Sequence, residues 1–230
     1  MRFVGRMLKV DYDVILWDWN GTLLDDGQFG LGIINGMLRR RGMREPAEEE
    51  HRCLFDFPVR RYYERLGFDF NREPFETVSQ EFVDAYIAEV TSCPLRVGAR
   101  ETLALLQESG FRQSVLSASR QDYLEHLIHH YGLEEFFDEL LGIDSVHAPG
   151  KADRGIEWIR ESGINPERVL LIGDTMHDAD VATGMGIDCW LMEGGHHAME
   201  RLAETGRPCL PDLMQVRTRL ADRASSPISR

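Results

Sequence analysis

No apolar run in the sequence approaches the roughly 18 residues that a membrane-spanning helix requires. The first residues, Met1 to Arg6, also hold no apolar stretch long enough for a secretory signal peptide. These two absences argue against an integral membrane protein and lead us to expect a cytoplasmic one.

Cysteine is scarce, and positive charge is in deficit. The four cysteines form no CxxC pair, which argues against a zinc site or a disulfide framework and favours reduced thiols. Asp and Glu outnumber Lys and Arg by 39 to 26, so the net charge is −13. Nucleic acids and anionic membranes attract clustered positive charge, and we therefore expect neither as a partner. An acidic chain that binds phosphate needs a local cation, which points to a metal ion.

What the sequence does have is an alternation of strand-like and helix-like segments. The apolar run Val14 to Trp17 is short and stopped by a turn, as in a buried strand of a parallel sheet. From residue 99 onward, helices and strands alternate, which predicts an α/β fold with a doubly wound parallel sheet. The expected helices are 99–109, 120–131, 152–162, 177–184 and 196–205, and the expected strands are 112–117, 138–142, 168–172 and 187–191.

The block between the first strand and residue 93 has only helical patterns. Apolar residues recur at helical spacing from Phe29 to Leu38, and further helical patterns cover 46–54, 58–67 and 74–91. This block indicates a helical subdomain inserted directly after the first strand.

Two of the expected strands end in acidic residues. Asp18 follows Val14 to Trp17, and Asp174 and Asp178 follow the run Val169 to Ile172. Ligands of parallel sheets bind beyond the carboxyl ends of the strands, so these acids are candidate nucleophiles or metal ligands. Capping of the following turn or helix remains the alternative for each of them.

These motifs resemble those of the haloacid dehalogenase-like hydrolases over roughly Tyr12 to Met192. The family's first motif is an Asp nucleophile, a spacer, a second Asp and Gly-Thr, and the matching residues here are Asp18, Trp19, Gly21 and Thr22. Its last motif, Gly-Asp with an Asp four positions later, is matched by Gly173, Asp174 and Asp178. The family's intervening Ser or Thr and Lys are matched by Ser117 and Lys151.

The resemblance implies a magnesium-dependent, phosphoglycolate-phosphatase-like hydrolase of a small phosphorylated metabolite, which works through an aspartyl-phosphate intermediate. It implies a Rossmann-like core of residues 1–26 and 94–222, a helical cap of residues 27–93 and a flexible tail of residues 223–230. The implied catalytic residues are Asp18, Asn20, Ser117 and Lys151. The implied substrate-binding residues are Thr22, Ser117, Ala118 and Lys151. Mg²⁺ would involve Asp18, the backbone carbonyl of Asn20, Asp174 and Asp178, the last of them through a metal-bound water or by orienting Asp174.

Asn20 departs from the family pattern, because a second Asp usually stands there and an amide cannot transfer its proton. A phosphate-binding or partner-binding protein without turnover therefore remains an alternative. A dehalogenase-like or phosphonatase-like enzyme is another, although no lysine occurs between Val10 and Gly150 to form a Schiff base in the cap. Ser119 rivals Ser117 as the phosphate-binding hydroxyl. The oligomeric state is left open.

Overall fold

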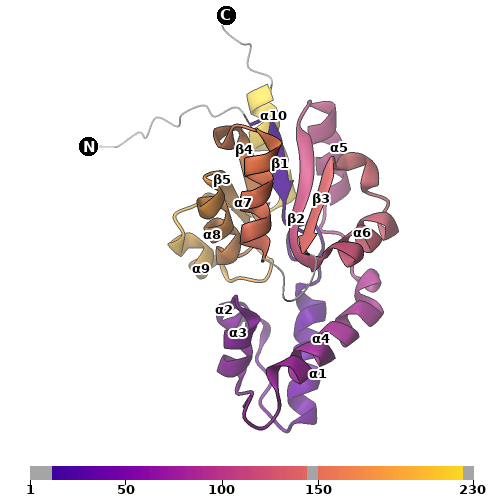
Figure 1. The fold of residues 1–230 in the computed structure, drawn as a ribbon, viewed down its shortest axis with the longest axis vertical. Helices are drawn as coiled ribbons and strands as arrows, with labels where there is room; N and C mark the ends of the chain where they lie inside the picture. Colours follow the sequence, from indigo (N-terminus) through magenta and orange to yellow (C-terminus); the bar gives the residue numbers. More distant parts are fainter. Residues whose placement is uncertain (1–11, 144–149, 225–230) are drawn as a thin grey trace, which may run out of the picture.

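The structure, a computed structural model, describes residues 12–143 and 150–224. Within these residues, six parallel strands form one sheet in the order β3-β2-β1-β4-β5-β6 (Figure 1). The strands are β1 (Val14–Trp17), β2 (Arg112–Arg120), β3 (Glu139–Ile143), β4 (Val169–Gly173), β5 (Asp188–Met192) and β6 (Cys209–Leu210). This arrangement confirms the predicted doubly wound parallel sheet.

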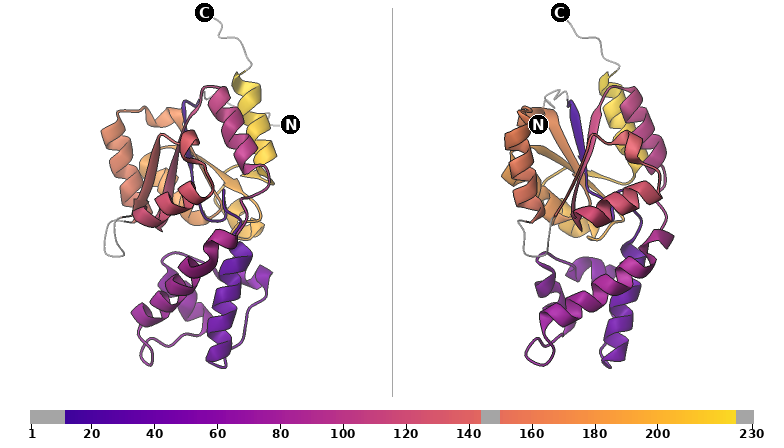
Figure 2. Two further views of the ribbon diagram at one scale, coloured as in Figure 1. Left: turned by 90° about the vertical axis from the view of Figure 1, so that its right-hand side faces the viewer. Right: turned by 45° about the vertical axis from the view of Figure 1, so that its right-hand side comes forward.

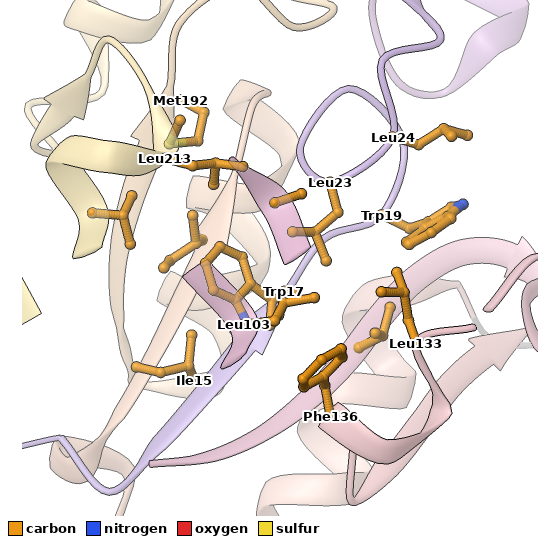
Figure 3. Close-up of a cluster of buried hydrophobic side chains, with 14 of the residues drawn as sticks. Ile15, Trp17, Trp19, Leu23, Leu24, Leu103, Leu133, Phe136, Met192 and Leu213 are labelled. Atoms are coloured by element: carbon orange, nitrogen blue, oxygen red, sulfur yellow. The ribbon is translucent and has the colours of Figure 1, made fainter. Parts of the chain in front are cut away.

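Helices cover both faces of the sheet, which explains why β1 is apolar at every position. Ile15 and Trp17 pack on the face covered by α5 (Ala99–Glu108), α6 (Gln121–His130) and α10 (Leu213–Ala224) (Figure 3). Val14 and Leu16 pack on the opposite face, against α7 (Lys151–Ser162), α8 (Met176–Met185) and α9 (Met199–Glu204). Every side chain of β1 is therefore buried in one of the two apolar layers, and no position of this strand faces water.

Four helices follow β1 and lie beyond the carboxyl ends of the strands (Figure 2). They are α1 (Gly27–Arg40), α2 (Glu48–Leu54), α3 (Val59–Leu66) and α4 (Phe75–Glu89). They share an apolar cluster of their own that includes Ile34, Met37 and Tyr62. We call residues 27–93 the cap. Its division from the core at residues 26 and 94 stays a prediction, and residues 225–230 of the predicted tail lie outside the described residues.

Two predicted boundaries near the site were wrong. Strand β2 continues past Ser117 to Arg120. The helix expected from residue 196 begins only at Met199. The backbone N–H of His196 instead donates to Asp174, and the His197 ring accepts a hydrogen bond from the Met176 N–H, so both histidines lie in a loop.

The prediction also assigned no element to residues 206–222, where the structure has β6 and α10. No helix in the described part of the chain is long and apolar enough to cross a membrane.

Candidate active site

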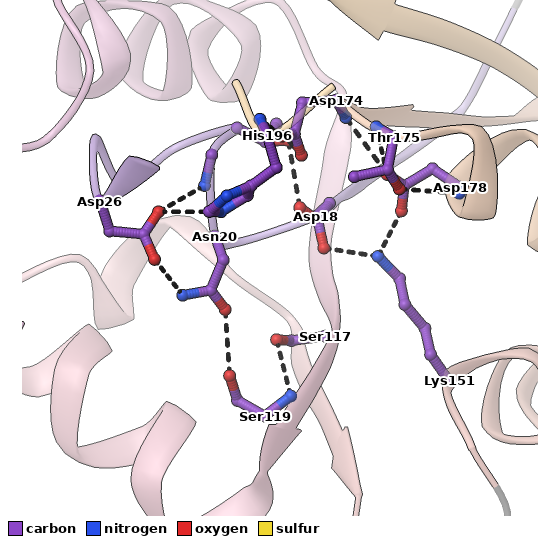
Figure 4. A network of polar contacts seen from close by, with 12 residues as sticks. Asp18, Asn20, Asp26, Ser117, Ser119, Lys151, Asp174, Thr175, Asp178 and His196 are labelled. Carbon is purple, nitrogen blue, oxygen red and sulfur yellow. Dashed lines mark hydrogen bonds and ion pairs between the residues drawn. The ribbon is translucent and has the colours of Figure 1, made fainter. Parts of the chain in front are cut away.

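Asp18 and Asp174 come together because their strands are neighbours. Strands β1 and β4 pair in parallel with Trp17 opposite Ile172, and the Asp18 N–H donates to the Ile172 carbonyl at 2.8 Å. The chain order reverses between these two strands, which is where ligands bind in doubly wound sheets. Asp18, Asp174 and Asp178 each direct a carboxylate oxygen into one cluster, in which these atoms lie within 4.8 Å of one another (Figure 4).

Lys151 connects two of these acids. It is the first residue of α7, and its Nζ lies 2.5 Å from one oxygen of Asp18 and 2.5 Å from one oxygen of Asp178. Burial opposes its charge, but Asp178 and Asp18 outweigh burial and raise the pKa of Lys151 above its ordinary value. Its ammonium group is therefore held as a fixed positive charge beside Asp18.

Asp178 serves both as a helix cap and as a partner of Lys151. Its second oxygen accepts hydrogen bonds from the Thr175 N–H at 3.0 Å and the Thr175 hydroxyl at 2.7 Å. The Asp178 N–H donates in return to the Thr175 hydroxyl oxygen at 3.3 Å, which completes a capping box with Thr175 as N-cap of α8. Burial alone would raise the pKa of Asp178, but Lys151 lowers it. Both oxygens are thus occupied by protein donors, which suits a residue that orients the cluster.

Asp174 is enclosed by backbone and by the Thr22 hydroxyl. That hydroxyl lies 3.0 Å from Asp174 and 3.1 Å from Asp18. Gly21 has φ +73°, and a Cβ there would lie 2.3 Å from an Asp174 oxygen. The Gly-Thr turn after Asp18 is therefore required by the close approach of Asp174.

The donor chemistry of this cluster fits a hard divalent cation. Three carboxylates with one lysine leave excess negative charge, and carboxylate oxygens are the ligands that Mg²⁺ prefers. Burial and the neighbouring acids raise the pKa of Asp18 well above its usual range despite Lys151, and burial also raises the pKa of Asp174. A cation at this point would relieve that repulsion, so the cluster is able to hold a metal ion.

The Asn20 side chain makes three hydrogen bonds, none of them to the cluster of Asp18, Asp174 and Asp178. Its amide nitrogen donates to Asp26 at 2.8 Å and to the Tyr86 hydroxyl at 2.6 Å. Its carbonyl oxygen accepts from the Ser119 hydroxyl at 3.1 Å. The residue in the family's acid–base position therefore joins the cap, the core and the loop between them.

Asp26 and His196 are site residues that the sequence reasoning missed. Asp26 is buried, accepts the Gly21 N–H at 2.8 Å and pairs with His196 Nε2 at 3.3 Å. Burial opposes protonation of His196, but Asp26 raises its pKa to about 9. The signal for a loop was present in Gly194-Gly195 before His196, whereas nothing in the sequence separates Asp26 from its neighbour Asp25.

The three consecutive residues 117–119, near the end of β2, differ in whether they line the cavity in front of Asp18. Ser117 is 1% exposed, and its hydroxyl accepts a hydrogen bond from the Ser119 N–H at 3.1 Å. Ala118 and Ser119 line the cavity in front of Asp18. Ser119 is not the N-cap of α6, which is Arg120.

That cavity, which we call the chamber, has a volume of about 220 Å³. On the core side it is lined by the acids, Lys151, His177 and His196, and on the cap side by Gly30, His51, Phe55, Phe57, Phe82 and Tyr86. The cap thus covers the acidic cluster with aromatic rings.

A family model of the haloacid dehalogenase-like hydrolases matches residues 15–192. The chain therefore belongs to this family, as its motifs predicted, and the match contains Asp18, Lys151, Asp174 and Asp178.

Individual relatives are distant. The chain is 23% identical over 198 residues to the tyrosine-protein kinase PtkA of Mycobacterium tuberculosis, covering 84% of this chain and 66% of the relative. It is 22% identical over 222 residues to phosphoglycolate phosphatase 1 of Pseudomonas aeruginosa, covering 92% and 80%. The fold matches that of a haloacid dehalogenase-like family protein, SP0104 of Streptococcus pneumoniae, with a TM-score of 0.78, 20% identity and coverage of 90% and 98%.

Proposed function

We propose that this chain is a magnesium-dependent hydrolase of a small phosphorylated metabolite, with Asp18 as nucleophile. One observation carries the proposal: Asp18, Asp174 and Asp178 converge at the carboxyl ends of β1 and β4, with the Lys151 ammonium 2.5 Å from Asp18. A relative named phosphoglycolate phosphatase supports the substrate class. The four free cysteines fit the proposed cytoplasmic location.

In the first half of the proposed reaction, a carboxylate oxygen of Asp18 attacks phosphorus. The bond from phosphorus to the leaving oxygen breaks, and that oxygen takes the electron pair. Lys151 offsets the charge on the transferring group. Mg²⁺, held by Asp18, the Asn20 backbone carbonyl and Asp174, would screen the repulsion between carboxylate and phosphate.

In the second half, water attacks phosphorus and the bond from phosphorus to the Asp18 oxygen breaks. The Asp18 carboxylate is regenerated, and inorganic phosphate leaves with the oxygen and hydrogens of the water. The Asn20 amide neither supplies a proton to the leaving oxygen nor removes one from water. We therefore expect turnover to favour leaving groups that depart as stable anions.

The test is Mg²⁺-dependent release of phosphate by the full chain and by Asp18→Asn. Asp25→Asn is a matched control, because Asp25 is an exposed acid in the same loop. The proposal predicts loss of activity in Asp18→Asn only. Near-normal turnover by Asp18→Asn would show that Asp18 is not the nucleophile.

The engaged amide of Asn20 favours one second candidate, a phosphate-binding protein without turnover. In that case calorimetry would detect binding of inorganic phosphate in the presence of Mg²⁺, while no substrate would release phosphate.

A further inference from the structure

We propose that the chamber selects phosphate monoesters whose leaving group carries one aromatic ring and no charge of its own. This inference rests on the proposed hydrolase function and adds the class of substrate.

The first observation is the aromatic lining of the cap side. Phe55 and Phe57 lie in the link between α2 and α3, and Phe82 lies on α4, so two separate segments of the cap contribute rings to the chamber lining. Two of these rings also contact core histidines. Phe55 lies 5.2 Å from the His196 ring and Phe57 lies 4.8 Å from the His177 ring, measured between centroids. These contacts hold the rings together as one aromatic wall, and a ring of the substrate would pack against the part of this wall that lines the chamber.

The second observation is that the lining, as far as the described residues form it, offers no uncommitted cation. Lys151 is bonded to Asp18 and Asp178, and His196 is paired with Asp26. No arginine lines the chamber among the described residues. Burial lowers the pKa of His51 to about 4, so this ring faces the chamber uncharged.

Three cap arginines, on α2 and α3, have partners of their own. Arg65 pairs with Asp56, Arg52 pairs with Glu48, and Arg60 lies over the rings of Phe70 and Phe75. A carboxylate on the leaving group would therefore enter a space in which the described lining residues include buried acids and no free positive partner, which is costly.

The third observation is size. The chamber holds about 220 Å³, and an apolar cavity of about 150 Å³ accepts benzene. The remaining volume suits a phosphoryl group against Asp18. Gly30 on α1 lines this space. A Cβ at Gly30 would lie 4.0 Å from the Phe82 ring and would therefore take up room beside that ring.

The aromatic lining and Asn20 favour the same substrates for different reasons. The rings lower the KM of any ester that carries a ring, whereas the amide at position 20 favours leaving groups that depart without a proton. An aryl phosphate satisfies both conditions.

Three phosphate esters and one acyl phosphate separate the two effects. Phenyl phosphate has a ring and a good leaving group, and benzyl phosphate has a ring and a poor one. Acetyl phosphate has a good leaving group without a ring, and glycerol phosphate has neither. With Mg²⁺ and the full chain, we expect KM to be about 10- to 100-fold lower for the two ring esters, the range expected for burying one ring. Phosphoglycolate, with its carboxylate, should show the highest KM.

The matched variants are Gly30→Ala and Gly32→Ala. Both replace a glycine of α1, but a Cβ at Gly32 meets nothing within 4 Å, and Gly32 does not line the chamber. Gly30→Ala should lower, several-fold, the ratio of the KM for acetyl phosphate to the KM for phenyl phosphate. Gly32→Ala should leave this ratio unchanged.

The outcomes distinguish the inference from the function on which it rests. Asp18-dependent turnover with equal KM for ring and ring-free esters, or with phosphoglycolate preferred, would overturn the inference and leave the hydrolase proposal standing. Equal ratios in the two glycine variants would also overturn it. Absence of Asp18-dependent turnover on every ester would overturn the hydrolase proposal and this inference with it.

Discussion

The phenol of Tyr86 on α4 donates a 2.6 Å hydrogen bond to the carboxylate of Asp26, 60 residues earlier in the chain. Asp26 directly precedes α1 and accepts the N–H of Gly21 in the nucleophile loop. The last long helix of the cap and the loop after Asp18 are therefore held by the same carboxylate.

Tyr86→Phe should lower the free energy of unfolding by about 1–3 kcal/mol, since it removes one buried donor to Asp26 and one of the two acceptors of the Asn20 amide. Urea denaturation measures the loss. Tyr123→Phe is the control, because the Tyr123 hydroxyl makes only one long hydrogen bond, of 3.4 Å, to the Ile87 carbonyl. Equal losses in the two variants would mean that the Tyr86–Asp26 hydrogen bond contributes no more to the free energy of unfolding than the Tyr123 contact does.

Asn20→Asp should destabilise the protein at pH 8 by on the order of 1–3 kcal/mol. The change replaces the amide that donates to Asp26 with a second carboxylate at the same distance, which raises a carboxyl pKa. A raised carboxyl pKa costs stability at high pH, and the cost shrinks as protonation relieves the repulsion. Thermal melts at pH 8 and pH 5 should therefore show the larger deficit at pH 8, and a deficit independent of pH would contradict this account.

Combining Asn20→Asp with Asp26→Asn should restore both the hydrogen bond and an acid at position 20. Turnover of glycerol phosphate should rise by on the order of 10²–10⁴ relative to the native chain. Steady-state rates check this, with Asp26→Asn alone as the control. If the double variant is no faster than that control, a carboxylate at position 20 is insufficient.

Magnesium should raise the melting temperature, because it binds the native cluster and relieves its like charge. At 100 times the dissociation constant the stabilisation is about 2.7 kcal/mol. Asp174→Asn should shrink the magnesium-dependent shift, whereas Asp180→Asn, which removes an exposed acid nearby, should leave it intact. Identical melts of the native chain with and without millimolar magnesium would count against a preformed site.

His51 should make the protein less stable as pH falls from about 6.5 to about 4. Burial lowers the pKa of His51 in the folded chain to about 4. Between pH 6.5 and 4 the imidazole is therefore protonated in the unfolded chain but neutral in the folded chain, which favours unfolding. Over the full window the effect is about 3 kcal/mol. His51→Gln should flatten the dependence of the unfolding free energy on pH, and His126→Gln, at an exposed position, should not. Parallel pH profiles for the native chain and His51→Gln would contradict the prediction.

The acids of the site were predictable because each follows a strand that is buried on both faces. Val14 to Trp17 and Val169 to Ile172 have no polar residue, so the first acid after each marks the edge of the sheet. Neighbouring parallel strands bring such edges together, and the pairing of β1 with β4 was a consequence of the fold class.

The partners of Asn20 could not be predicted in the same way. Tyr86 and Ser119 lie 66 and 99 residues away, and their contacts depend on how the cap helices pack on the core. His196 was placed in a helix by local pattern, although its backbone N–H is bonded to Asp174. Local periodicity carries no information about such long-range hydrogen bonds.

The burial of Lys151 makes this residue a chemical probe of solvent access to the chamber. The chain has two lysines, Lys9 and Lys151, and the Lys151 side chain is 3% exposed between two carboxylates. An acylating reagent attacks a neutral, accessible amine, so Lys151 is protected by both its charge and its surroundings. The rate at which a label accumulates at this residue, read by peptide mass spectrometry, therefore reports how often the Lys151 amine leaves its two carboxylates and becomes exposed.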